Sequence, residues 1–175
     1  MVAFESYLGR QFDLDQPGRK PAIGAEVSPY GVDLNIRYEA PDVDALILRA
    51  QKAMPAWRDA GPQARAGVCL EILHRLNRRS FEMAFAVMHT TGQGFMMAFQ
   101  AGGPHAQDRG LEAVAYAYEA MTAQPERVVW EKPQGKNPPL LVEKTFKVVP
   151  RGIALMIGCS TFPTWNGYPG LFASL

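Results

Sequence analysis

The sequence predicts an α/β fold in which a layer of helices is followed by a strand pair and by the first strand of a parallel sheet. Three observations carry this prediction. Apolar residues recur at helical spacing over residues 41–124, the pattern becomes β-prone after residue 125, and the run from Gly152 to Gly158 is continuously apolar. A continuous apolar run is typical of a strand that is covered on both faces of a parallel sheet.

The composition is that of a packed globular protein, and it lacks the excess of positive charge that would attract polyanions. The 175 residues include 47% hydrophobic residues, and 18 basic side chains nearly balance 17 acidic ones, which leaves a formal net charge of +1. We therefore expect no nucleic-acid partner. No stretch of eighteen uncharged apolar residues and no signal-peptide pattern is present, so we expect no membrane association and a cytoplasmic location.

The cysteines and histidines give no sign of a metal site. Cys69 and Cys159 lie ninety positions apart, and neither has the spacing of a zinc ligand. His74, His89 and His105 follow no regular spacing and have no paired carboxylate. We expect no bound metal, and we expect Cys69 to serve as a small apolar residue in a helix stripe.

Residues 1–40 are expected to form an extended arm with turns. Prolines and glycines, among them Pro17, Gly18 and Pro21, interrupt the region before any element can lengthen. Near the end of the arm, Val32 to Tyr38 alternates apolar and polar side chains, which is the period of a half-buried strand.

Residues 41–124 are expected to form the helical layer, beginning with two helices. Asp42 sets the start of the first helix, where a carboxylate suits the positive end of the helix dipole, and Gly61 with Pro62 stops it. In the second helix an apolar stripe lies opposite Arg65, Glu71 and Arg78. The members of the stripe are Val68, Cys69, Ile72, Leu73 and Leu76.

Two further helices complete the layer. Ser80 is a plausible cap for the third, which ends at Gly92, where glycine can adopt the left-handed conformation. The fourth aligns apolar residues from Leu111 to Met121 and ends before Pro125. The layer therefore holds at least four amphipathic helices in succession.

Residues 125–150 are expected to form a strand pair. Val128 to Trp130 is β-prone, Pro133 to Pro139 is interpreted as a loop, and Leu140 to Val149 alternates apolar with charged residues. A strand at an edge leaves backbone groups unpaired, a liability that proteins often resolve by pairing with another copy. We therefore expect self-association through Leu140 to Val149.

Residues 151–175 are expected to hold the first strand of the parallel sheet and the turn that follows it. Only seventeen residues follow Gly158, too few for a crossover helix and a returning strand. The apolar stretch from Leu171 to Leu175 has no capping residue. We therefore expect the remaining strands to lie in sequence that follows this chain, or in another chain.

The order of these features resembles the aldehyde dehydrogenase superfamily. The run Met54 to Arg58 is similar to a motif of its helical layer, and Pro150-Arg151-Gly152, the apolar run and Cys159 to Pro163 match in spacing its Pro-x-Gly, strand and Pro-Trp-Asn-Phe-Pro. Within the superfamily the chain most resembles the phenylacetic acid degradation protein (PaaN) family. That likeness is carried by five runs: Ser28 to Gly31, His89 to Gln93, Ala101 to Gly110, Trp130 to Lys136 and Thr161 to Pro169.

The resemblance implies a parent enzyme, an oxidoreductase that uses NAD or NADP to oxidise a coenzyme A-linked aldehyde formed by ring opening in phenylacetate degradation. The choice between NAD and NADP stays open, because the residues that contact the adenine ribose usually follow the second strand of the sheet. In the family the strand pair is the oligomerisation arm, which agrees with the expected homo-oligomer.

The resemblance also places candidate site residues at the carboxyl edge of the sheet, where cofactors bind in open α/β folds. The expected cofactor-lining residues are Ile157, Gly158, Cys159, Ser160 and Thr161. An ordinary strand-to-helix turn is the alternative reading of the same segment.

Thr161 takes the place of the family asparagine whose side-chain amide donates to the oxyanion. Asn166 is the rival by residue type, although it would require a five-residue insertion. Cys159 stands at the family's proline position and is expected to pack or to line the cofactor. The family's nucleophilic cysteine and activating glutamate would fall beyond Leu175, so the chain alone is expected to be inactive.

A non-catalytic oligomerisation or partner-binding module is the alternative function. In that case the helices and the exposed strand would have no redox chemistry of their own. Threonine in place of asparagine at position 161 favours this alternative.

Overall fold

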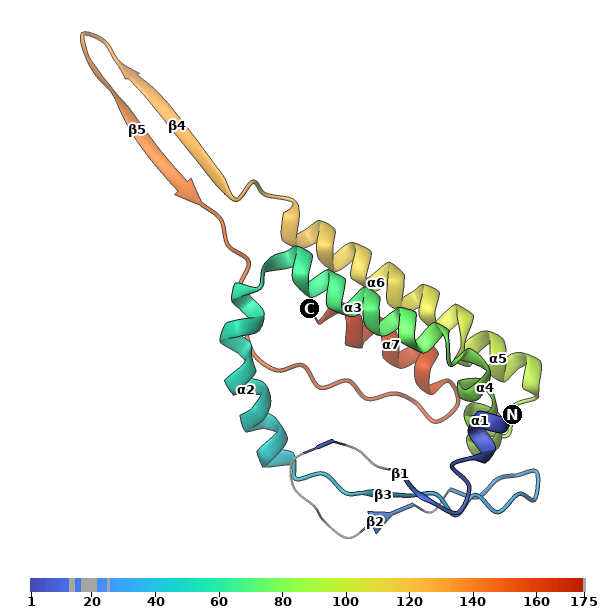
Figure 1. Cartoon of the computed structure of the whole chain (residues 1–175). Helices are drawn as coiled ribbons and strands as arrows, with labels where there is room; N and C mark the ends of the chain where they lie inside the picture. The colour runs from blue at the N-terminus through green and yellow to red at the C-terminus, as the bar shows by residue number, and fades with distance from the viewer. Residues whose placement is uncertain (13–14, 17–21, 25, 175) are drawn as a thin grey trace.

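The computed structural model describes residues 1–12, 15–16, 22–24 and 26–174, so that the arm positions Pro17, Gly18 and Pro21 and the terminal Leu175 lie outside the described residues. A helical body carries a small sheet at one end and a long hairpin at the other (Figure 1). The elements in chain order are α1 Val2–Glu5, β1 Gln11–Phe12, β2 Ala22–Ile23, β3 Arg37–Glu39, α2 Val43–Asp59, α3 Gly61–Asn77, α4 Ser80–Thr91, α5 Phe95–Gly102, α6 Pro104–Thr122, β4 Arg127–Gln134, β5 Asn137–Thr145 and α7 Pro163–Ala173.

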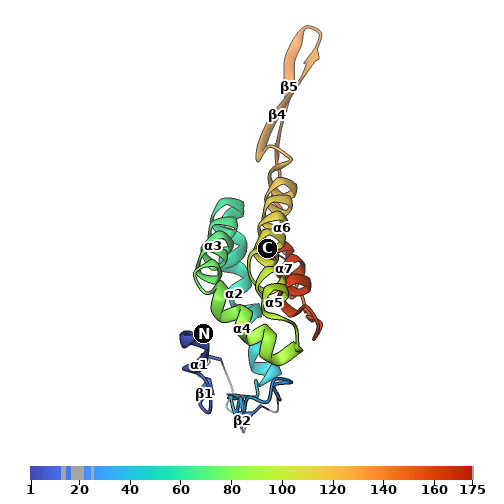
Figure 2. The same ribbon diagram turned by 90° about the vertical axis from the view of Figure 1, so that its right-hand side faces the viewer.

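Helices α3, α6 and α7 lie side by side and enclose the principal core (Figures 1 and 2). The prediction that Cys69 is a core residue is confirmed, because it is buried in this cluster. The helices approach closely at Gly110, where a Cβ would lie 2.8 Å from Leu73 and 2.9 Å from Phe172. The buried members of the core are Ala66, Cys69, Leu73, Ala113, Val114 and Phe172.

Several predicted helix boundaries are confirmed. The Asp42 side chain accepts a hydrogen bond from the backbone N–H of Ala45 at 3.1 Å and so caps α2. Helix α4 ends at Gly92, whose φ of 79° is left-handed. Ser80 is not the cap that the sequence predicts, because it is already inside α4 and its hydroxyl donates to the carbonyl of Asn77 at 2.8 Å. Gly61 does not separate two helices by a loop but is the first residue of α3.

Arg65 corrects the predicted orientation of α3. The sequence pattern places it on the polar face, yet it is only 1% exposed, and its Nε donates to the carbonyl of Gly61 at a long 3.4 Å. Helix α3 has apolar residues on more than one side, and Val68 and Ile72 of the expected stripe are exposed. The side of α3 that packs is decided by its neighbours in the fold, which periodicity alone does not reveal.

The amino-terminal arm forms a three-stranded sheet in which β3 pairs parallel with β1 and antiparallel with β2. The strand predicted from Val32 to Tyr38 is wrong in extent, since β3 begins only at Arg37. Asn35 adopts a left-handed φ of 46°, which interrupts the extended backbone at a residue type that tolerates it.

Strands β4 and β5 form an antiparallel hairpin that projects away from the helical body (Figures 1 and 2). The predicted strand pair is confirmed, but the strands extend into the segment expected to be a loop, from Pro133 to Pro139. The tight turn is closed by Gly135 at φ 65°. Prolines are tolerated there because both strands are edges, and the register shifts where Pro133 falls, between Lys132 and Gln134.

The predicted buried strand from Gly152 to Gly158 is not formed. The segment is an irregular coil with exposed side chains, including Leu155 at 84% and Ile157 at 77% exposure. A strand exists only by hydrogen bonding to a neighbour, and in the described part of the chain no strand pairs with this one. The sequence pattern predicts neither α5 nor α7. Helix α7 follows the coil and packs on α6.

No helix in the described residues is both long enough and apolar enough to cross a membrane.

Candidate functional site

The residues that the sequence assigns to a candidate site lie in the turn between the coil and α7. All of them are exposed: Ile157, Gly158, Cys159, Ser160 and Thr161. Gly158 lets the turn close, because a Cβ there would lie 2.9 Å from the carbonyl oxygen of Pro163. The chain then runs back along α6 as α7 (Figure 1).

Hydrogen-bond donors converge on the sulfur of Cys159. The backbone N–H of Phe162 donates to Sγ at 3.3 Å, and the side-chain amide of Asn166 donates to it at 3.0 Å. These hydrogen bonds lower the pKa of the Cys159 thiol below its usual value. Phe162 contributes most, Asn166 comes next, and the neighbouring Thr161 contributes less. At Cys69, burial raises the pKa of the thiol, so Cys159 is the more readily ionised of the two.

Thr161 and Asn166, which the sequence left as rivals, are brought to the same place. The Asn166 amide donates to Cys159 Sγ, and Thr161 lies beside the sulfur, where it makes a smaller contribution to the lowered pKa of the thiol. N–H and O–H groups that point at one position stabilise negative charge there. The charge can be carried by a thiolate or by a bound oxygen atom. Ile157 and Ser160 are exposed like Thr161, but they do not contribute to this donor cluster.

Contacts from other parts of the helical body hold the turn. The side-chain amide of Gln93, in the link between α4 and α5, donates to the carbonyl oxygen of Thr161. The hydroxyl of Thr164 donates to the carbonyl of Gly102 at 3.1 Å. The Arg109 guanidinium lies 5.5 Å from the centre of the Trp165 ring, within the range of a cation–π contact.

The runs Ser28 to Gly31 and His89 to Gln93, which carry part of the family resemblance, pack against each other although about sixty residues separate them. Ser28 Oγ lies 2.8 Å from Nδ1 of His89, and the Tyr30 hydroxyl donates to the carbonyls of Gly92 and Gln93 at 3.0 Å and 2.8 Å. The buried His89 ring also stacks on Phe4 at 5.1 Å. His89 is therefore part of the packing between arm and α4, and the described residues include no group of three side chains able to hold a metal ion.

Sequence reasoning missed Gln93 as a site residue. The run His89 to Gln93 carries part of the family resemblance, but nothing in it points to a position 68 residues away. The signal that could have pointed to it is Gly92, where a left-handed helix end turns the chain away from α4 just before Gln93.

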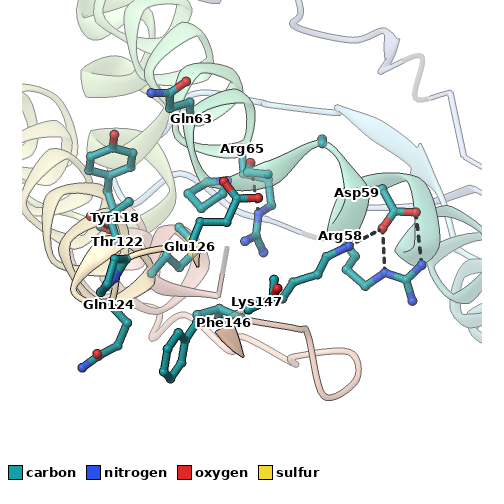
Figure 3. A pocket seen from close by; sticks show the side chains of 17 residues that line it. Arg58, Asp59, Gln63, Arg65, Tyr118, Thr122, Gln124, Glu126, Phe146 and Lys147 are labelled. Carbon is teal, nitrogen blue, oxygen red and sulfur yellow. Dashed lines mark hydrogen bonds and ion pairs between the residues drawn. The ribbon is translucent and has the colours of Figure 1, made fainter. Parts of the chain in front are cut away.

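A cavity of about 580 Å³ lies at the base of the hairpin, apart from the turn, and none of residues 157–161 lines it (Figure 3). Asp59 accepts hydrogen bonds from Arg58 at 2.9 Å and from Lys147 at 3.0 Å, and these partners hold the pKa of its carboxyl well below the usual range. Both ion pairs are exposed, so water screens the attraction between their charges. Arg65 of α3 and Tyr118 of α6 also line the cavity. The base of the hairpin therefore meets α2, α3 and α6 at this cavity.

Among the solved structures that resemble the chain is the NAD-dependent aldehyde dehydrogenase from Burkholderia multivorans. The two are 64% identical, the TM-score is 0.95, and the match covers 99% of this chain. The chain spans 31% of the length of that relative. No protein-family profile and no curated protein matches the sequence.

Proposed function

The chain has the fold of the amino-terminal part of an aldehyde dehydrogenase, and from this premise we propose that it belongs to an NAD-dependent oxidoreductase that oxidises an aldehyde. The match over nearly the entire chain at high identity carries the proposal. The relative is named for NAD, which favours NAD over NADP for the proposed enzyme.

The coil and the turn support this assignment. The apolar side chains of Gly152 to Gly158 are exposed, as expected for a strand whose sheet neighbours and covering helices come from the rest of the protein. The turn after it would then lie at the carboxyl edge of a cofactor sheet. The donors around Cys159 and Thr161 suit a polar or anionic group at that edge.

In the proposed enzyme the residues of this chain bind and orient, and others carry out covalent chemistry. Bound NAD would accept the hydride, and the turn from Ile157 to Thr161 would lie against it. Thr161, with Asn166 beside it, would stabilise the oxygen that gains negative charge. We expect the nucleophilic cysteine and its activating glutamate in the remaining sequence, so Cys159 is assigned no nucleophilic role.

The function is tested by assaying two proteins for aldehyde-dependent reduction of NAD and NADP. One is the 175-residue chain, and the other is the product of the complete coding sequence. We expect turnover with NAD from the complete product and none from the chain. Robust turnover by the chain, or a complete product that neither binds nor reduces either cofactor, would contradict the proposal.

For the substrate we propose a coenzyme A-linked, ring-opened aldehyde of phenylacetate degradation. The five sequence runs shared with the phenylacetic acid degradation protein family support this choice, and three of them, from Ser28, His89 and Thr161, meet around the turn. Steady-state kinetics with coenzyme A-linked and free aldehydes of equal chain length provide the test. A kcat/KM that does not favour the linked aldehyde would argue against it.

We also propose that the hairpin mediates self-association, as expected from the sequence for Leu140 to Val149. Both of its strands are edges, and Trp130, Leu140 and Leu141 are exposed along it. A partner-binding module without redox chemistry would use the same hairpin, so self-association does not depend on the enzymatic proposal.

A further inference from the structure

We propose that Gln93 is a positioning residue, which sets the direction of the donors around Cys159 by hydrogen bonding to the carbonyl oxygen of Thr161. The hydrogen bond links two segments that lie 68 residues apart, the connection between α4 and α5 and the turn before α7. That this turn faces a cofactor rests on the proposed function. That Gln93 shapes the turn is independent of it.

The peptide group between Thr161 and Phe162 explains how this hydrogen bond acts. A trans peptide is planar, and its C=O and N–H point in opposite directions. Gln93 binds the carbonyl oxygen of this group, and the N–H on its other side donates to Cys159 Sγ at 3.3 Å. A hydrogen bond accepted by the carbonyl also polarises the peptide and strengthens its N–H as a donor.

The backbone of Gln93 is itself held in place from three sides. Its carbonyl accepts a hydrogen bond from the Tyr30 hydroxyl at 2.8 Å, and its N–H donates to Thr91 Oγ1 at 3.3 Å. The preceding residue, Gly92, has a left-handed φ of 79°, and a Cβ there would lie 3.2 Å from Pro29. The amino-terminal arm thereby aims the Gln93 side chain at the turn.

The surroundings of the Gln93 amide favour positioning over stabilisation. Its Oε1 is buried and has no hydrogen-bond partner among the residues that the structure describes. Burial of an amide oxygen without a partner is unfavourable. The amide therefore contributes little net stability, and an apolar side chain of similar size should fold as well while leaving the Thr161 carbonyl without its donor.

The test measures the pH dependence of Cys159 alkylation by iodoacetamide in the full chain, with peptide mass spectrometry separating Cys159 from the buried Cys69. The variants are Gln93→Leu, which removes the donor, and Gln93→Lys, which keeps a donor of similar reach. Gln100→Leu is the matched control, because Gln100 is an exposed amide on α5. Thermal unfolding of each variant confirms that it is folded.

We expect the alkylation midpoint of Gln93→Leu to rise by about one pH unit, because the Phe162 N–H would no longer be directed at the sulfur, and a hydrogen bond to a thiolate is worth roughly that much. Gln100→Leu should keep the original midpoint, and Gln93→Lys should show no rise, because it retains a donor and adds a positive charge near the thiolate. An unchanged midpoint in folded Gln93→Leu, or an equal rise in Gln100→Leu, would overturn the inference. Failure of the complete protein to bind NAD would overturn the proposed function and leave this result standing.

Discussion

At the scale of residues, the candidate site is a set of donors directed at one atom, Cys159 Sγ. The set combines a backbone N–H from Phe162 and a side-chain amide from Asn166, the second of which lies one turn inside α7. The sequence identified the segment and both candidate donors, Thr161 and Asn166, by motif spacing and residue type. It could not show that they act together, because their common target depends on how the turn folds back onto α7.

Replacement of Asn166 by leucine should weaken the donor set directly. The sulfur loses the hydrogen bond from the Asn166 amide and keeps the one from the Phe162 N–H, so the pKa of Cys159 should rise toward its ordinary value. Ionisation of the thiol would then require a higher pH, and alkylation at pH 7 should slow severalfold. The rate of modification of Cys159, followed by peptide mass spectrometry, checks this expectation. An unchanged rate would mean that Asn166 does not act on the sulfur.

Gly110 and Gly67 offer a matched pair for the packing of the helical body. A Cβ on Gly110 would overlap Leu73 and Phe172, whereas one on Gly67 of α3 would meet nothing within 4 Å. Gly110→Ala should lower the free energy of unfolding by about 1–2 kcal/mol, since overpacking exceeds the gain in helix propensity. Gly67→Ala should raise it by up to about 1 kcal/mol. Urea unfolding of both variants measures the difference, and equal effects would contradict the close approach of α3, α6 and α7.

At the scale of elements, some helices and strands are determined by their own local sequence, and others form only beside a neighbouring element. The start of α2 at Asp42, the end of α4 at Gly92 and the β4–β5 hairpin were predictable, because capping and turn chemistry are local. Helices α5 and α7 were not predictable, since glycine at the end of α5 and glycine and proline within α7 interrupt the helical pattern. The predicted strand from Gly152 to Gly158 failed for the opposite reason: its pattern is clear, but hydrogen bonding to a neighbour is not a local property.

The hairpin gives the prediction that belongs to this scale. Trp130, Val142 and Leu140 share one face in the observed register, and Lys132 lies directly opposite Leu140. Leu140→Glu can pair with Lys132 and so preserve the hairpin, but it removes an apolar contact from the proposed interface. Association should weaken at least tenfold, since burial of a leucine contributes about 2 kcal/mol.

Light scattering across a dilution series measures this association for Leu140→Glu and for a control, Met96→Glu. Met96 is 64% exposed on α5, away from the hairpin. The control should associate like the unmodified protein. A strict monomer without any substitution, or equal weakening in both variants, would show that the hairpin is not the interface.

At the scale of the whole molecule, the helical body is a packed unit, while the hairpin and the coil from Gly152 to Gly158 expose apolar residues to solvent. Exposed apolar residues in this amount indicate surfaces that bind something else. We propose that the hairpin binds another copy and that the coil joins the sheet of an NAD-dependent enzyme. The chain spans 31% of the length of the solved relative.

Amide hydrogen exchange on the product of the complete coding sequence, with and without NAD, tests this account most directly. If the turn lies against the cofactor, the amides of residues 157–161 should exchange more slowly when NAD is bound, while those of the hairpin should not change. Binding of NAD that leaves exchange at residues 157–161 unaltered would contradict the account.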